Sequence, residues 1–326
     1  MTLSVRVDSF TTLEEAWQAL LPGANADTIF FTPQWQQIWW QKFGHHAELC
    51  LLSLHDGNRL LGIAPLMREG DTLSFVGDTD VCDYLDFIVA RGQEDAFYET
   101  LLDYLDKEDW IALDLHCLAA TSLTLTYLAP QAQKRGYSVE TTVEDVCPRV
   151  DLPANWEEYL ALLGKKDRHE LRRKMKRLFE SGETRYYALE KTEDVAKGLE
   201  DFFHLHKQSR QEKARFMTEE MAHFFRQIAA SAAEIGHLKL YFLEIDGMRT
   251  STALCFDYGD ELSLYNSGFD PAYASLSVGL LLKAFCLKEA IAAGKKRFDF
   301  LRGSEPYKYD LGGQDLPIYR CLIRKN

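Results

Sequence analysis

The sequence predicts a mixed α/β protein whose sheets are largely antiparallel. Short apolar runs typical of strands are separated by the turn sequences Asp56-Gly57-Asn58 and Glu69-Gly70-Asp71, which favour β-hairpins. Longer segments with a helical period of apolar residues stand before, between and after these runs. Because helices and single strands do not alternate throughout the chain, a fully parallel doubly wound sheet is not expected.

The first half begins with an amphipathic helix over 34–43, for which Thr32 is a suitable cap and Pro33 a suitable first-turn residue. Strand-like runs follow, joined by the hairpin turns, and helical periods return after them. The expected strands are 47–54, 60–68, 72–76, 86–90 and 110–116, with two short strands ending near Leu152, and the expected helices are 93–106 and 121–135.

The second half shows the same order of elements with longer helices. Asp246-Gly247 is expected to join two strands as a hairpin turn, and Gly294 is a suitable residue to end a helix. The expected helices are 155–181, 192–211, 218–235 and 276–293, and the expected strands are 237–245, 250–258, 261–267, 297–301 and 317–323. The shared order predicts two domains of similar architecture, at 1–152 and 153–326.

Composition restricts the class of function. A chain of 326 residues is long enough for two domains, and its formal net charge of -13 argues against non-specific binding of nucleic acid. No apolar run reaches the roughly 20 residues that span a bilayer, and the first residues do not resemble a signal peptide. The seven cysteines are scattered without the paired spacing of zinc ligands, so we expect reduced core cysteines, no metal and a cytoplasmic protein.

The junction between the strand ending near Ser267 and the following helix is a candidate anion site. Backbone amides at a helix start lack partners within the helix and lie at the positive end of its dipole, which favours phosphate groups. The alternative is an ordinary helix start capped by serine. The expected phosphate-binding residues are Ser275, Leu276, Ser277, Val278 and Gly279.

This junction, with the helix, Gly294 and the strand after it, resembles the acyl-CoA-binding core of the GNAT acetyltransferase superfamily. Gly279 and the small Ser277 match part of the superfamily's Arg/Gln-x-x-Gly-x-Gly/Ala turn. Downstream, Asp299-Phe-Leu-Arg-Gly-Ser-Glu-Pro-Tyr-Lys resembles the end of Fem-type peptidoglycan aminoacyltransferases and, more closely, of CelD-like acetyltransferases associated with cellulose and exopolysaccharide synthesis. The resemblance extends over nearly the whole chain, and it implies two tandem GNAT domains with acyl-CoA, foremost acetyl-CoA, as co-substrate.

The resemblance places the acyl-transfer site around Tyr307 and Lys308. A fixed lysine cation would stabilise the negative charge that develops on a thioester carbonyl oxygen under attack. Glu305 is a candidate base if burial raises its pKa, and Tyr307 or Tyr265 is a candidate proton donor to the leaving thiolate. Arg302 suits a phosphate or carboxylate. The alternative is that these charged side chains pair with one another at the surface.

Candidate acceptor-binding residues lie elsewhere in the chain. His206 and Arg210 are four residues apart and are expected on one helix face, and the CelD-like resemblance makes His206 a candidate base or acceptor ligand. The alternative is that His206, as a lone helical histidine, is structural. Tyr84 and Asp86 are candidates in the first half, where hairpin capping is an equal alternative. The basic segment 165–177 suits an anionic acceptor, CoA phosphates or RNA, but its apolar stripe also fits a solvated amphipathic helix.

These observations favour an acyltransferase that moves an acyl group from acyl-CoA to an amine or hydroxyl of a small molecule, a sugar or an envelope or polysaccharide precursor. The first alternative is Fem-like transfer from aminoacyl-tRNA, for which a sustained coiled-coil pattern is absent. The second alternative, from a different class, is a ligand-binding or scaffold protein that keeps the fold without catalysis.

Overall fold

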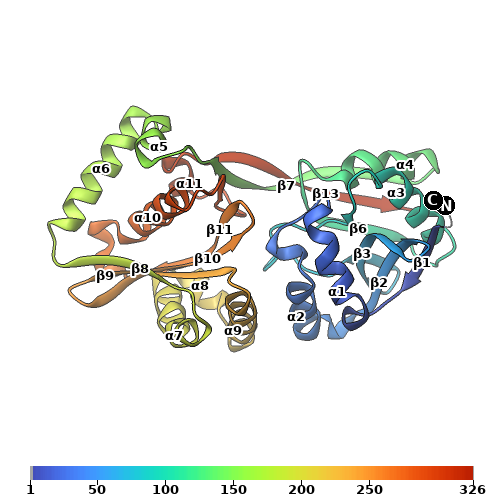
Figure 1. Cartoon of the computed structure of the whole chain (residues 1–326), viewed down its shortest axis with the longest axis horizontal. Helices are drawn as coiled ribbons and strands as arrows, with labels where there is room; N and C mark the ends of the chain where they lie inside the picture. Colours follow the sequence, from blue (N-terminus) through green and yellow to red (C-terminus); the bar gives the residue numbers. More distant parts are fainter. Residues whose placement is uncertain (1–2, 326) are drawn as a thin grey trace. The chain divides into compact units, whose positions relative to one another are not determined.

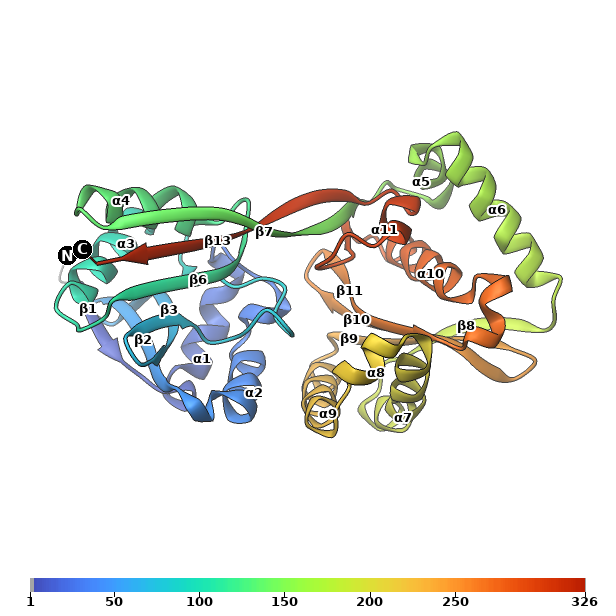
Figure 2. The same cartoon turned by 180° about the vertical axis from the view of Figure 1, so that it is seen from behind.

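The computed structural model describes residues 3–325, which form two compact units (Figures 1 and 2). Unit 1 contains the described residues up to Val146 and those from Leu316 onward, and unit 2 contains Cys147–Asp315. Strands β7 (Ser138–Asp151) and β13 (Gln314–Arg324) each contribute residues to both units. No helix in the described part of the chain combines the length and apolar character needed to cross a membrane.

Unit 1 is built on strands in the order β1-β2-β3-β4-β6-β13-β7. Neighbouring strands β1 to β4 pair antiparallel, whereas β4 and β6 pair in parallel. Helix α3 buries Phe97, Tyr98 and Leu101 in the core. The remaining elements are β1 (Leu3–Val7), α1 (Phe10–Leu20), α2 (Pro33–Phe43), β2 (Glu48–Asp56), β3 (Arg59–Glu69), β4 (Thr72–Phe75), β5 (Ile88–Val89), α3 (Glu94–Leu105), β6 (Ala112–Ala119) and α4 (Ala129–Lys134).

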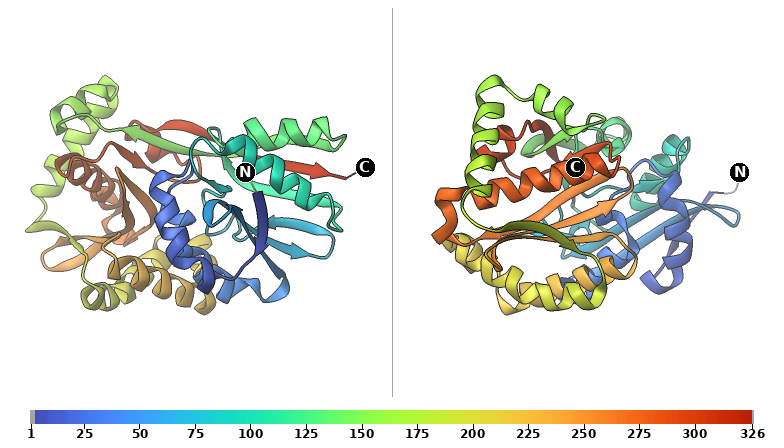
Figure 3. Two further views of the ribbon diagram at one scale, coloured as in Figure 1. Left: turned by 45° about the vertical axis from the view of Figure 1, so that its right-hand side comes forward. Right: turned by 60° about the vertical axis from the view of Figure 1, so that its left-hand side comes forward.

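Unit 2 contains strands in the order β7-β12-β11-β10-β9-β8, with helices on both faces (Figures 1 and 3). Helix α10 packs with α5 and α6 on one face, and α7 and α9 pack against the other. The elements are α5 (Trp156–Leu162), α6 (Lys165–Phe179), β8 (Thr184–Leu189), α7 (Thr192–Ser209), α8 (Gln211–Phe216), α9 (Glu219–Glu234), β9 (Leu238–Ile245), β10 (Met248–Tyr258), β11 (Glu261–Phe269), α10 (Val278–Ala292), β12 (Arg297–Asp299) and α11 (Pro306–Asp310).

Most expected elements are present, and the differences have local causes. The helix expected over 155–181 is divided into α5 and α6, because Leu163 has an extended backbone (φ -67°, ψ 145°). The two short strands expected near Leu152 are one long strand, β7. The segment 121–135 begins with a π-helical turn, Thr124–Leu128, before α4. The expected elements do not include β1, α1, β8, α8 and α11; all of these except α1, which has 11 residues, are short.

The compact units differ from the expected domains at the end of the chain. The expected boundary follows Leu152 and places the chain end in the C-terminal domain, whereas unit 1 also contains the described residues from Leu316 onward. The reason is that β13 pairs antiparallel with β6, with Ile318 opposite Ala119 and Ile323 opposite Leu113. This pairing is long-range, so no local pattern indicates it.

Helix α7 packs directly on β11 at Gly268. A Cβ atom there would lie 2.4 Å from the backbone nitrogen of His206, a contact that only backbone movement can relieve. We expect Gly268→Ala to destabilise unit 2 by about 1–3 kcal/mol, as overpacking of an interior does. Urea unfolding would compare the stability of Gly268→Ala with that of Gly23→Ala, whose added Cβ has no atom within 4 Å. Equal midpoints for the two variants would contradict this prediction.

Candidate active site

Strand β12 pairs in parallel with the beginning of β11 only. The paired residues are Glu261 with Arg297, Leu262 with Phe298, and Ser263 with Asp299. Beyond Ser263, β11 continues to Phe269, whereas β12 ends. Within residues 3–325 no strand pairs with this edge of β11 after Ser263. The uncovered edge therefore offers backbone groups to an extended ligand.

The uncovered part of β11 also contains a β-bulge. Leu254 of β10 lies opposite Asn266 and Cys255 lies opposite Leu264, so Tyr265 has no counterpart on β10. A bulge twists its strand and changes the direction of the following side chains. The Tyr265 ring packs against Phe225 and Phe256, at centroid distances of 5.3 and 5.1 Å. Tyr265, expected as a proton donor, thus has its ring in an aromatic cluster.

The start of α10 lies after a short 3₁₀ turn, Pro271–Leu276, and a left-handed residue, Ser277 (φ 59°). The amide of Ser277 donates to the carbonyl of Ala274 at 2.9 Å, so this amide is not available, contrary to expectation. The first amides of α10, from Val278 onward, have no acceptor within the helix. Gly279 packs closely on Phe269, whose Cδ1 atom would lie 3.0 Å from an added Cβ.

Arg177 of α6 lies beside this helix start. Its guanidinium donates to the Ser277 hydroxyl at 3.4 Å, and its Nε atom is buried without a hydrogen-bond acceptor among residues 3–325. A positive side chain with an unused donor next to free helix amides fits a phosphate or pyrophosphate group. The remaining basic residues of α6 are mostly exposed, and several form ion pairs with Glu157, Glu170 and Glu180, as a solvated helix face does.

Lys308 is held inside the loop that follows β12. Its ammonium group is buried and donates to the carbonyl oxygens of Leu301, Arg302 and Gly303 at 2.7–2.9 Å. It also forms an ion pair with Glu305 at 2.9 Å. Every ammonium proton therefore has an acceptor already, and the side chain fixes the shape of the loop.

Glu305 does not show the raised pKa on which its expected role as a base depends. Burial disfavours its charged form, but the ammonium group of Lys308 outweighs this effect, and the pKa of Glu305 lies below its ordinary value. Its carboxylate is ionised at neutral pH and compensates the charge of Lys308. Burial raises the pKa of Tyr307, so its phenol keeps its proton and remains a possible donor.

Two lysines that sequence analysis did not select lie close to this loop. Lys283 is buried on α10, donates to the carbonyl of Gly279 at 3.0 Å and lies 4.6 Å from the ring centre of Tyr307. Lys213 of α8 donates to the carbonyl of Ser267, on β11, at 2.5 Å. The only sequence signal for Lys283 is its position as a lone charge in the apolar first turns of α10. Lys213 lies among other charged residues and carries no such signal.

The expected pair of His206 and Arg210 is not on one helix face. Helix α7 ends at Ser209, and Arg210 has an extended backbone (φ -158°, ψ 149°) that turns the chain into α8. His206 is buried, and its Nε2 atom lies 2.8 Å from the Oδ1 atom of Asn266 on β11. Burial and the charge of Lys213 lower the pKa of His206 to about 3, so the imidazole is neutral and joins α7 to β11.

Tyr84 and Asp86 are part of the packed interior of unit 1. Tyr84 is 6% exposed, and its ring lies 6.2 Å from that of Phe30. Asp86 is 7% exposed and accepts hydrogen bonds from the Thr124 hydroxyl at 2.5 Å and the Phe87 amide at 2.8 Å. Burial raises the pKa of Asp86 to about 6. These contacts are those of core residues rather than of an open binding surface.

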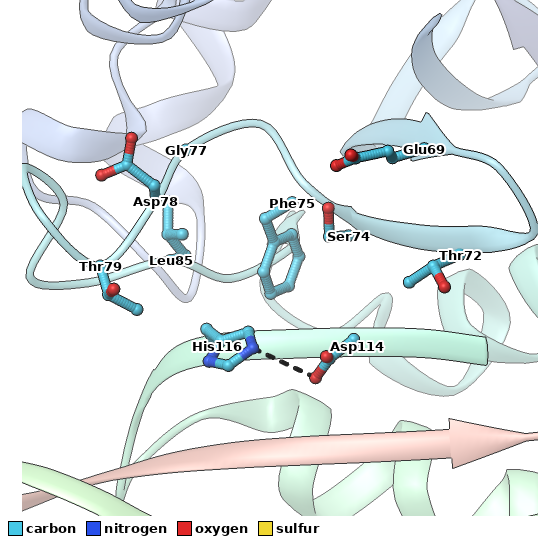
Figure 4. A pocket seen from close by; sticks show the side chains of 10 residues that line it. All are labelled: Glu69, Thr72, Ser74, Phe75, Gly77, Asp78, Thr79, Leu85, Asp114 and His116. Atoms are coloured by element: carbon cyan, nitrogen blue, oxygen red, sulfur yellow. Dashed lines mark ion pairs between the residues drawn. The ribbon is translucent and has the colours of Figure 1, made fainter. Parts of the chain in front are cut away.

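A cavity of about 520 Å³ lies in unit 1 where its own parallel strands part (Figure 4). Strands β4 and β6 pair from Thr72 to Ser74, and the cavity extends beyond this pairing. His116 lies between the carboxylates of Asp114 and Glu144, whose hydrogen bonds raise the pKa of His116 to about 9. The residues that line the cavity are Glu69, Thr72, Ser74, Phe75, Gly77, Asp78, Thr79, Leu85, Asp114 and His116.

The side chains differ in charge between the two places where parallel strands separate, which are β4 and β6 in unit 1 and β11 and β12 in unit 2. The cavity in unit 1 is lined by the acidic residues Glu69, Asp78 and Asp114. In unit 2, helix α10 has no acidic residue in its first turn. Negative charge repels phosphate groups, so unit 2 is the better site for a phosphorylated ligand.

Comparison with known proteins agrees with the geometry of unit 2. Residues 165–309 match the acetyltransferase (GNAT) domain family. A search of curated protein sequences finds no match to the chain. The match covers most of unit 2 and includes α6, the start of α10 and the Lys308 loop. No group of three or more His, Cys, Asp or Glu residues is placed to hold a metal ion within residues 3–325.

Solved structures show the same fold over nearly the whole chain. The crystal structure of FemX has a TM-score of 0.68 at 11% identity, covering 97% of this chain and 96% of that chain. The C-terminal domain of a putative lysylphosphatidylglycerol synthetase from Agrobacterium fabrum has a TM-score of 0.61 at 11% identity, covering 96% and 92%. A tandem GNAT protein from the clavulanic acid biosynthesis pathway has a TM-score of 0.50 at 12% identity, covering 98% of each chain.

These likenesses confirm the predicted fold class. The protein is mixed α/β with mostly antiparallel sheets, and it has the fold of tandem GNAT proteins. At 11–12% identity the likeness concerns the fold alone.

Proposed function

We propose that this protein transfers an acyl group, foremost acetyl, from acyl-CoA to an amine or hydroxyl of an acceptor. The observation that carries the proposal is the uncovered edge of β11 beside the free amides of α10. An extended thioester arm fits such an edge because its amide groups can pair with the strand as another strand would. The pyrophosphate fits the start of α10 and the unused Nε donor of Arg177.

The chemistry needs no group besides the two substrates and the protein. The acceptor nitrogen or oxygen forms a bond to the carbonyl carbon, the carbon–sulfur bond breaks, and the acceptor proton ends on the CoA thiol. Negative charge develops on the carbonyl oxygen, and cations in a buried site stabilise it. Lys283 has ammonium protons left after its bond to Gly279, whereas Lys308 has none. Tyr307, which keeps its proton, remains our candidate donor to the thiolate.

From the CelD-like resemblance, we propose that the acceptor is a sugar or an envelope or polysaccharide precursor. The transfer would take place in the cytoplasm, where CoA thioesters are formed. Arg210, which is exposed, is the acceptor ligand that we retain from the sequence prediction. His206, Tyr84 and Asp86 are buried and would act only through their neighbours. The resemblance of residues 299–308 to Fem-type aminoacyltransferases gives one alternative donor, an aminoacyl-tRNA.

Calorimetric titration with acetyl-CoA tests the donor site. We expect Arg177→Gln to weaken binding about tenfold or more, because a charge-assisted hydrogen bond contributes roughly 1.5–3 kcal/mol. Lys176→Gln removes the same charge from an exposed neighbour on α6, with 77% of its side chain accessible, and should bind as the parent does. Absence of binding by the parent protein would refute the acyl-CoA proposal, and binding of aminoacyl-tRNA instead would support the alternative.

A further inference from the structure

Four cationic side chains gather around one carboxylate in unit 2. They are Lys213 of α8, Lys283 of α10, Lys308 of α11 and Arg210, which precedes α8, and the carboxylate is that of Glu305. Lys213 interacts electrostatically with each of these groups. Four positive charges around one negative charge repel one another, and the low dielectric beside the buried Lys283 and Lys308 strengthens the repulsion. One of the amines therefore loses its proton most readily.

The contacts single out Lys213 as that amine. Lys308 has three carbonyl acceptors and the carboxylate of Glu305, all of which favour its charged form. Lys283 donates to a carbonyl and lies against the Tyr307 ring, whose π face attracts a cation. Arginine stays protonated in proteins.

Lys213 has a single acceptor, the carbonyl of Ser267, at 2.5 Å among the described residues. Burial, together with the charges of Lys283 and Arg210, lowers the pKa of Lys213 to about 7. Near neutral pH a substantial fraction of this side chain is therefore a neutral amine, which has a lone pair available for a proton.

The position of Lys213 matches the uncovered edge of β11. Ser267 lies four residues beyond Ser263, the last residue that pairs with β12. The amide of Ser267 donates to the Asn266 side chain at 2.9 Å, and its carbonyl accepts from Lys213, so both are bound by side chains. Lys213 thus brings an amine to the edge where the proposed function locates the acyl donor.

We propose that Lys213 is the general base of the reaction. The inference rests on the proposed function and assigns one of its steps. The neutral amine takes the proton from the acceptor nitrogen or oxygen as that atom bonds to the thioester carbonyl carbon. The carbon–sulfur bond then breaks, and the ammonium returns the proton to the thiolate, either directly or through Tyr307. The amine is neutral again at the end, and no further reactant is consumed.

The pH dependence expected from Lys213 involves the groups that surround it. His206 is neutral above about pH 3, and the carboxylate of Glu305 is ionised throughout the neutral range. Burial lowers the pKa of Lys283 to about 8, so Lys283 titrates in a pH range close to that of Lys213. Lys308 and Arg210 contribute positive charge. Loss of the proton from Lys283 would remove a stabilising cation and would lower the rate at alkaline pH.

The test is the pH profile of thiol release from acetyl-CoA, measured on the full chain. The acceptor is the one among glucosamine, glucose and simple primary amines that gives the fastest thiol release with the parent protein. For the parent, kcat/KM should rise with pH to a midpoint near 7 and fall at alkaline pH. In both Lys213→Met and Lys213→Arg, kcat/KM should be about a hundredfold or more lower than in the parent, because general-base catalysis typically contributes 10²–10⁴-fold. Their pH profiles should also lack the rise near pH 7. Lys283→Met should keep the rise but move it to higher pH, because the charge of Lys283 no longer lowers the pKa of Lys213.

Controls separate this inference from the proposed function. Calorimetric binding of acetyl-CoA within about twofold of the parent would show that the Lys213 variants are folded. Activity of Lys213→Arg equal to that of the parent, or an unchanged midpoint in Lys213→Met, would refute the role of Lys213 and leave acyl transfer standing. Absence of thiol release by a parent protein that binds acetyl-CoA would refute the proposed function and this inference with it.

Discussion

Lys308→Met should lower the free energy of unfolding by about 3 kcal/mol or more. The substitution keeps a long side chain but removes the ammonium group that donates to the carbonyls of Leu301, Arg302 and Gly303. Buried acceptors left without a donor each cost roughly 1–3 kcal/mol, and Glu305 loses its ion-pair partner as well. Urea unfolding followed by circular dichroism would measure the loss.

The control for this prediction is Lys176→Met, which removes a lysine with 77% of its side chain exposed and should change stability by less than about 0.5 kcal/mol. If Lys308→Met were as stable as the parent yet inactive, the ammonium of Lys308 would act on the substrate, as the sequence alone suggested. If the variant loses stability, as we expect, Lys308 shapes the loop that holds Tyr307. The two outcomes therefore distinguish a catalytic lysine from a positioning lysine.

The second large expected effect is a loss of unfolding free energy at acidic pH. His206 has a pKa of about 3 in the folded protein and about 6.5 when unfolded, so below pH 6.5 the unfolded chain binds a proton that the folded protein does not. The unfolding free energy should therefore fall as pH decreases, by about 1.4 kcal/mol per pH unit, until the folded protein also takes the proton near pH 3. Above pH 6.5 this contribution is constant.

The measurement compares unfolding free energies at pH 5 and pH 7, where most carboxyl groups stay ionised. His206→Gln keeps a hydrogen-bonding side chain but has no proton to gain, so its stability should depend less on pH than that of the parent. His204→Gln, at an exposed position of the same helix, should keep the dependence of the parent. Equal slopes for the parent and His206→Gln would contradict a neutral buried histidine.

Local patterns predicted much of the architecture because turns and helix ends depend on a few adjacent residues. The Asp246-Gly247 turn joins β9 to β10 as expected, and Asp246 and Gly247 have the positive φ angles of 50° and 78° that such a turn needs. Gly294, with a φ of 74°, follows the end of α10 as a helix-ending glycine does. Thr32 caps α2 by accepting from the Trp35 amide.

The candidate site was predicted in outline for a related reason. The order of strand, small residues and apolar helix identified the start of α10, and the stretch from Asp299 to Lys308 identified the loop beside it. The sequence does not show that Lys308 uses all its protons within that loop, because the number of acceptors around an ammonium group depends on how the loop closes. Nor does it show that the same lysine lowers the pKa of Glu305.

The sequence by itself determined the class of fold, the positions of most helices and strands, and the region of the chain that carries the site. These features follow from periodicity and from turn chemistry, which act over a few residues. Only the tertiary structure decided three other features. Most of β13 belongs to unit 1, the edge of β11 is uncovered after Ser263, and Lys213 lies close enough to Lys283 for the two charges to interact. Each of these depends on contacts between distant segments, and the charge of a buried amine depends on every group that packing brings near it.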